Sequence, residues 1–135
     1  MNRRASLIFA WCLLCLVGRS QAVYQGSTPA DLPVRKFLAI SLTDSIDFIR
    51  WRLTIGPQGY EVHCQYGISK PNTPGFIDPK TAQFSGTINL QGNYLQLMHG
   101  SASLSVLKIN TNILHLLDQN KNFLIGNGIL LVKEI

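Results

Sequence analysis

Two side chains that could do chemistry together, those of His63 and Cys64, are adjacent in the sequence. A thiolate beside an imidazole can act as a nucleophile with its base, or both groups can bind a soft metal ion. The surrounding residues alternate between apolar and polar types, which predicts a β-strand, and adjacent side chains of a strand point to opposite faces. The two groups therefore cannot converge on one atom, and we predict that Cys64 is a buried structural thiol.

Three further residues carry atoms that can bind metals: Met98, His99 and His115. Met98 and His99 could join Cys64 as soft copper ligands, but the three are not at a spacing that recurs in chelating sites. His115 lies between two leucines of an apolar segment, which predicts a structural hydrogen bond or a ring that faces solvent. We predict no metal site and no cofactor.

The carboxylates of Asp44 and Asp47 are close in sequence to Arg50 and Arg52. Two carboxylates could act as acid and base, but a carboxylate beside an arginine stays ionised near neutral pH. We predict that Asp47 pairs with a neighbouring arginine. The sequence also contains none of the motifs G-x-S-x-G, H-E-x-x-H and G-x-x-x-x-G-K. We therefore predict a non-enzymatic protein with no catalytic residues.

Alternation with a period of two identifies the elements that position these groups. Residues 50–55 and 60–66 both alternate, and a G-P-Q-G turn at 56–59 joins them. The two segments are predicted to form a β-hairpin with one buried face. The side chains on that face are those of Trp51, Leu53, Ile55, Tyr60, Val62, Cys64 and Tyr66.

The rest of the chain is predicted to consist mostly of short strands. Glycine and proline predict an extended or irregular lead-in at 23–33 and a long exposed loop at 67–80. A helix is expected around 32–42, where Pro33 suits a first helical turn. Roughly six to eight strands with tight turns predict an all-β fold, a small antiparallel barrel or sandwich in a single domain. The later strands are expected at 82–90, 94–98, 104–109 and 113–117, with a polar turn at 118–122 leading into 123–125.

The first 22 residues have the pattern of a cleaved signal peptide. A basic head precedes an apolar run, and Ser20-Gln21-Ala22 has the small-x-small pattern of a cleavage site. We predict cleavage after Ala22, export to the periplasm or the medium, no stable membrane span after processing, and one domain at 23–135. The leader holds three of the 12 basic residues, so 9 remain against 7 acidic ones. This balance argues against a nucleic-acid partner.

Several segments together resemble one group of proteins. They are D-F-I-R-W-x-L-T at 47–54, Q-Y-G at 65–67, P-N-T-x-G-F at 71–76, S-G at 85–86, and the leucine-rich stretch at 112–128 that ends in G-N-G. The set is similar to exported, largely uncharacterised proteins of the Bacteroidetes that are distantly similar to the N-terminal domain of the NlpE copper-resistance lipoproteins. This resemblance implies a lipocalin-like, up-and-down β-barrel.

Two segments depart from that group. NlpE-like domains carry a P-C-A-D-C segment near the mature N-terminus, whereas residues 24–32 here contain no cysteine, which argues against a copper or redox role through thiols. Residues 129–135 also differ, and their continuous apolar run does not suit the half-exposed wall of a small barrel. We expect an atypical or truncated last strand that lies at an open edge and promotes self-association.

The favoured function is that of a non-enzymatic, exported, lipocalin-like domain that binds a small apolar ligand in the mouth or interior of its barrel. The predicted ligand-binding side chains are those of Trp51, Leu53, Tyr60, Tyr66 and Phe84. The same side chains could instead fill a closed core. The alternative function is an envelope-stress or metal-responsive module that acts through an envelope protein partner, as the NlpE resemblance implies.

Overall fold

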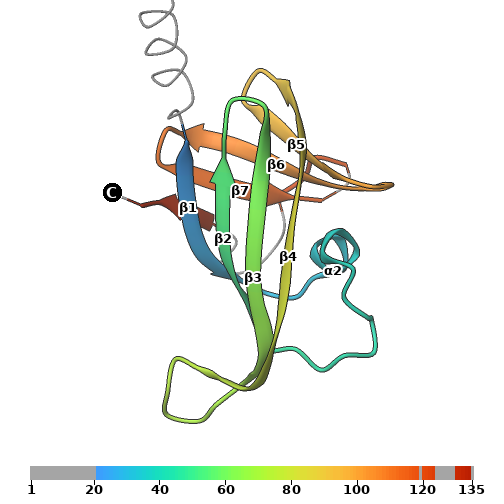
Figure 1. Cartoon of the computed structure of the whole chain (residues 1–135), viewed down its shortest axis with the longest axis vertical. Helices are drawn as coiled ribbons and strands as arrows, with labels where there is room; N and C mark the ends of the chain where they lie inside the picture. The colour runs from blue at the N-terminus through green and yellow to red at the C-terminus, as the bar shows by residue number, and fades with distance from the viewer. Residues whose placement is uncertain (1–20, 119, 124–129, 135) are drawn as a thin grey trace, which may run out of the picture.

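The computed structural model describes residues 21–118, 120–123 and 130–134. Within these residues, eight strands form a closed antiparallel barrel in which each strand pairs with its neighbours in sequence and the last pairs with the first (Figure 1). A short helix, α2 (Leu32–Leu38), connects the first two strands. The strands are β1 (Ala22–Thr28), β2 (Phe48–Ile55), β3 (Gly59–Ser69), β4 (Phe76–Gln91), β5 (Tyr94–His99), β6 (Ala102–Asn110), β7 (Ile113–Leu117) and β8 (Leu130–Lys133). This architecture confirms the predicted all-β fold, a small antiparallel barrel of the lipocalin-like kind.

The central hairpin of β2 and β3 forms as predicted. Trp51 lies opposite Cys64 and Leu53 opposite Val62, and these four side chains are at most 2% exposed. The residues between them face solvent. This alternation gives the hairpin one buried and one solvated face. The strands predicted at 94–98, 104–109 and 113–117 are confirmed as β5, β6 and β7.

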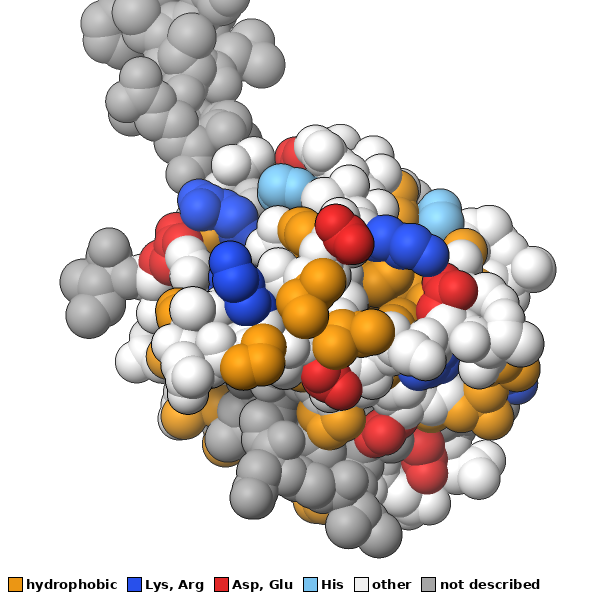
Figure 2. Space-filling view, turned by 90° about the horizontal axis from the view of Figure 1, so that it is seen from below, with side chains coloured by type: hydrophobic (Ala, Val, Ile, Leu, Met, Phe, Trp, Pro, Cys, Tyr) orange, Lys and Arg blue, Asp and Glu red, His pale blue; other side chains and the backbone are white. Residues whose placement is uncertain are grey.

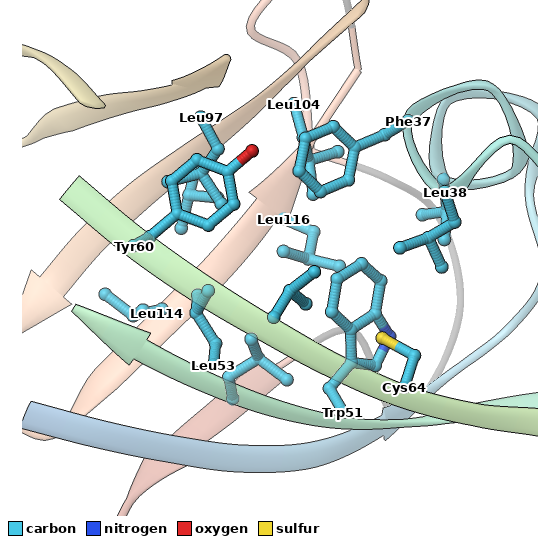
Figure 3. Packing of buried hydrophobic residues seen from close by; sticks show 14 of the residues in the cluster. Phe37, Leu38, Trp51, Leu53, Tyr60, Cys64, Leu97, Leu104, Leu114 and Leu116 are labelled. Carbon is cyan, nitrogen blue, oxygen red and sulfur yellow. The ribbon is translucent and has the colours of Figure 1, made fainter. Parts of the chain in front are cut away.

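Helix α2 exists as predicted but is shorter than the expected 32–42. It has Pro33 in its first turn and ends at Leu38, because Ala39 adopts a left-handed backbone with φ of 57°. Val34, Phe37 and Leu38 are at most 4% exposed, and their spacing forms one apolar stripe. Figure 3 shows Phe37 and Leu38 pointing from the helix into the cluster of buried strand side chains.

Close packing of β3, β4 and β5 depends on Gly86. A Cβ atom at this position would lie 2.1 Å from the carbonyl oxygen of Met98 and 2.7 Å from the hydroxyl oxygen of Tyr60, so only glycine fits. The Tyr60 hydroxyl uses this space and donates a hydrogen bond to the Met98 carbonyl at 2.7 Å. The bond ties β3 to β5 across β4.

The lead-in at 23–33, predicted to be extended or irregular, begins with the extended strand β1, which pairs with β2 over its whole length. The prediction of a long irregular loop is wrong. The expected loop at 67–80 is mostly a two-stranded ribbon, since β3 continues to Ser69 and β4 starts at Phe76. The ladder shifts register between Tyr66 and Ile68, which creates a bulge that contains Pro79. Proline has no backbone N–H to donate, and it is tolerated here because the bulge interrupts the ladder of hydrogen bonds. We call residues 66–80 the ribbon; Figure 1 shows it projecting below the barrel.

The prediction for the C-terminal strand is also wrong. Strand β8 pairs with β7 on one side and with β1 on the other, so it closes the barrel and does not lie at an open edge. Leu131 is fully buried while Val132 is 52% exposed, so the apolar run still alternates between two faces. Single apolar side chains on an outer wall are common, because folded proteins expose much apolar surface.

The predicted turn at 118–122 is present in its described residues. The Asp118 carboxylate accepts hydrogen bonds from the backbone N–H groups of Asn120 and Asn122. The predicted signal peptide, apart from residues 21 and 22, lies outside the described residues, as do 124 and 125. Throughout the described ranges, no helix has both the length and the apolar character needed to cross a membrane.

Candidate functional site

Three of the five predicted ligand-binding residues lie inside the barrel. Trp51, Leu53 and Tyr60 are 2%, 0% and 3% exposed, and Figure 3 shows them among other buried side chains. The indole N–H of Trp51 donates a hydrogen bond to the hydroxyl of Thr28 at 2.7 Å, and Thr28 is itself buried. The polar atom of this large side chain is therefore satisfied inside the core.

Apolar side chains from α2 and from several strands occupy the interior around these residues. An eight-stranded barrel is narrow enough for side chains to fill it. The large side chains of this cluster include Phe37, Leu97, Leu104, Leu114 and Leu116. The described interior is thus a packed core to which the predicted ligand-binding residues contribute.

Phe84 and Tyr66, the other two predicted ligand-binding residues, are half-buried. The Phe84 ring stacks on the ring of His99 with centroids 3.7 Å apart and meets Phe37 edge-on at 5.4 Å. It therefore belongs to the aromatic packing around α2. Tyr66 lies further along β3, where it lines a pocket at the surface.

The reactive groups of His63 and Cys64 lie on opposite faces of β3. Cys64 is buried and His63 is exposed, which confirms that the two side chains point to opposite faces. Burial raises the pKa of the Cys64 thiol, so the thiol stays protonated. His115 Nδ1 lies 2.8 Å from the Leu116 carbonyl oxygen, which is the expected structural hydrogen bond. Among the described residues, no three His, Cys, Asp or Glu side chains are grouped to hold a metal ion.

The predicted pairing of Asp47 with an arginine is wrong. Its carboxylate instead accepts a hydrogen bond from the backbone N–H of Ser69, which ties the segment before β2 to the end of β3. Arg52 pairs with Glu134 at 3.4 Å. The sequence did not indicate that Asp47 bonds to Ser69, because Ser69 lies in the segment predicted to be a loop.

Arg50 fixes one face of the ribbon. The rings of Phe48 and Phe76 stack with centroids 4.4 Å apart, and the Arg50 guanidinium lies 6.0 and 5.5 Å from them. The guanidinium also donates a hydrogen bond to the carbonyl of Pro74. Cation–π contacts and a charged hydrogen bond together hold the ribbon in one orientation.

The opposite face of the ribbon borders a pocket of about 270 Å³, which we call the ribbon pocket. Ile68 and Ile77 pair across the ribbon and are 45% and 46% exposed. Figure 2 views the molecule from this end and shows apolar side chains gathered among acidic and basic ones. The pocket is lined by the apolar side chains of Ile46, Tyr66, Ile68 and Ile77 and by the charged side chains of Asp44, Asp78 and Lys80.

The ribbon pocket was missed in the sequence because the segment 67–80 was predicted to be a loop. One signal could have found it. Ile68 and Ile77 stand on either side of the proline- and glycine-containing segment 70–75, as paired residues do in a hairpin with a longer turn.

A larger pocket, of about 430 Å³, is lined mainly by polar side chains of β5 and β6 and by Lys36 of α2. Gln96, Ser103 and Ser105 alternate with buried leucine and valine residues, so they belong to the solvated face of the wall. A polar wall of this kind is the usual outer surface of a barrel. The ribbon pocket differs because four of its lining side chains, those of Ile46, Tyr66, Ile68 and Ile77, are large and mainly apolar.

The fold defines the class of this protein, a small closed antiparallel β-barrel of the lipocalin-like kind. Comparison with protein-family models, with curated proteins and with solved structures found no match. The geometry of the described residues therefore supplies the basis for a functional proposal.

Proposed function

We propose that this protein is a non-enzymatic, exported, lipocalin-like domain that binds a protein partner through the ribbon pocket. The observation that carries the proposal is that two exposed isoleucines pair with each other and line the same pocket. Ile68 and Ile77 are 45% and 46% exposed at the pocket, whereas Ile49 and Leu53 inside the barrel are 0% exposed. Apolar side chains that are exposed together on an ordered surface are typical of interaction sites.

The size of the ribbon pocket favours one protein side chain over a whole small ligand. Sites for drug-sized ligands are usually about 300–1,000 Å³ and enclose most of the ligand. The ribbon pocket has about 270 Å³ and lies at the surface. A single apolar side chain inserted into such a pocket often forms the centre of a protein interface. The projecting ribbon offers additional backbone and side-chain surface beside it.

The place of action that we propose is the periplasm or the medium. The basic head, apolar run and small-x-small pattern of residues 1–22 support export. The resemblance to NlpE-type envelope proteins supports action through an envelope protein partner.

A small apolar ligand inside the barrel is the second candidate, favoured by the buried aromatic side chains of Trp51 and Tyr60. Such a ligand would have to displace side chains that are now 2% and 3% exposed. Removing the packing of one large core side chain costs about 2–5 kcal/mol. Binding at the ribbon pocket needs no such displacement, because its apolar side chains are already at the surface.

Isoleucine methyl groups at the ribbon pocket and inside the barrel allow a direct test of the two candidate sites. The δ1 methyl groups of the purified protein would be labelled and observed by NMR during a titration with n-octanol. We expect saturable shifts at Ile68 and Ile77 and none at Ile49. The variant Ile77→Lys should abolish the shifts, while the matched control Ile109→Lys, at a β6 residue that is 51% exposed, should not. Shifts at Ile49 that persist in Ile77→Lys would place octanol inside the barrel and refute the proposal.

A further inference from the structure

The rim of the ribbon pocket carries an excess of negative charge. Its charged residues are Asp44, Asp78 and Lys80. The ammonium of Lys80 lies 3.3 Å from the carboxylate of Asp44, so these two charges compensate each other. Asp78 forms no ion pair with any residue that the structure describes. One uncompensated carboxylate therefore lines the pocket together with the apolar side chains of Ile68 and Ile77.

The charges just behind the rim balance each other. The Arg35 guanidinium donates a hydrogen bond to the backbone carbonyl of Asp44 at 2.9 Å, which brings one positive charge to this end of the barrel. The Asp47 carboxylate, held by the N–H of Ser69, brings one negative charge. Among the residues that line the pocket, the uncompensated charge is therefore that of Asp78.

Asp78 is held next to Ile77 at the bulge in the ribbon. It directly follows Ile77, lies in the irregular part of the ladder opposite Gly67, and is exposed. Its φ of 45° is in the left-handed region, which aspartate tolerates better than most residues. Bulges re-aim side chains, and this one leaves the carboxylate free in solvent at the pocket.

We infer, resting on the proposed function, that the partner presents an apolar side chain with a lysine or arginine next to it in sequence. The apolar side chain enters the pocket against Ile68 and Ile77, and the cationic side chain pairs with Asp78. Complementary charge at an interface rim contributes more to selectivity than to affinity. An exposed ion pair contributes at most about 1 kcal/mol, which corresponds to a preference of about fivefold.

Three short peptides that differ in one charge provide the test. They are acetylated and amidated Gly-Leu-Lys-Gly, Gly-Leu-Gln-Gly and Gly-Leu-Glu-Gly, and their affinities are measured from the methyl shifts of Ile68 and Ile77. We expect the lysine peptide to bind more tightly than the glutamine peptide, by up to about fivefold, and the glutamate peptide to bind least tightly. The preference should shrink when the salt concentration is raised, because salt screens exposed charges.

Matched variants assign the preference to one carboxylate. Asp78→Asn should make the lysine and glutamine peptides bind equally, whereas Glu61→Gln, which removes an exposed carboxylate from the outer face of β3, should keep the preference. Equal binding of the lysine and glutamine peptides to the unmodified protein, or a preference that survives Asp78→Asn, would overturn the inference while leaving the proposed function intact. Failure of octanol to bind at Ile68 and Ile77 would instead remove the proposed function itself.

Discussion

Replacing Phe37 by alanine should destabilise the protein far more than the same change at a surface phenylalanine. The Phe37 side chain is fully buried, and its ring centroid lies 6.1, 5.4 and 6.3 Å from those of Tyr60, Phe84 and His99. Helix α2 has 7 residues, which is too short to be stable alone, so packing must hold it in place. Phe37 supplies the largest part of that packing, because it is the largest buried side chain of the helix.

The expected loss follows from the cost of removing a buried aromatic ring. Truncation of a core phenylalanine to alanine costs about 3–5 kcal/mol, against a total stability of about 5–15 kcal/mol for a typical domain. Each kcal/mol lowers the melting temperature by about 4 °C in a domain whose length lies between the 60–100-residue and 150–250-residue classes. Phe37→Ala should therefore lower the melting temperature by at least about 12 °C.

Urea unfolding followed by circular dichroism measures this loss, and Phe123→Ala is the matched control. Phe123 is 59% exposed and contacts the ring of His115 at 4.6 Å, so its truncation should cost less than about 1.5 kcal/mol. Equal losses in the two variants would refute the conclusion that α2 is held to the barrel by a buried anchor.

Three further predictions concern the thiol, the last strand and a buried phenol. Cys64 should react with a thiol reagent only as fast as the protein unfolds, because the side chain is fully buried and burial raises its pKa; rapid labelling of the folded protein would contradict this. Leu131→Lys should unfold the protein or sharply lower its melting temperature, whereas Val132→Lys should change the free energy of unfolding by less than about 1 kcal/mol; equal effects would mean that β8 does not close the barrel. Burial raises the pKa of Tyr60 from 10.0 to about 12, so its contribution to stability is present below pH 10 and is lost as the pH rises toward 12. The variant Tyr60→Phe should therefore lose less stability than the unmodified protein between those two pH values, and an identical pH profile would disprove the assignment.

Alternation predicted the central hairpin because each of its strands has one buried and one solvated face. The buried face carries apolar residues and the solvated face polar ones, so residue type alternates along both strands. The buried residues are Trp51 and Leu53 on β2 and Val62 and Cys64 on β3. The same alternation placed the thiol of Cys64 on the face opposite to His63. The alternation of residue types was sufficient to predict this hairpin, because one face of β2 and β3 is buried along the paired residues.

Ile68 and Ile77 could have indicated the hairpin of the ribbon, but the place of the ribbon beside β2 depends on contacts that are distant in sequence. Its strands lie largely outside the barrel, so exposure does not alternate as it does in the wall, and its prolines indicate a loop. Arg50 and Phe48 of β2 hold it in place, and neither residue belongs to the ribbon. The candidate site was missed together with the ribbon.

Closure by β8 could not be predicted for a similar reason. Lys133 and Val132 of β8 pair with Tyr24 and Gln25 of β1, so this pairing joins the two ends of the described chain. Pairing of this kind depends on tertiary context, which strand propensity does not report. The apolar run at 129–132 was therefore interpreted as an open edge, although β8 is paired on both sides.

We propose that an apolar group binds at the ribbon pocket and not inside the barrel, and the emission of Trp51 distinguishes these two sites. Trp11 lies in the predicted signal peptide, so Trp51 is the only tryptophan of residues 23–135, and it lies in the core at 2% exposure. Bromo-octanol quenches tryptophan emission at close contact, and the Ile77 methyl shift reports occupancy of the ribbon pocket in the same titration. We predict that Trp51 emission stays unchanged when the Ile77 shift has saturated; saturable quenching of Trp51 would place the bound group inside the barrel and contradict the claim.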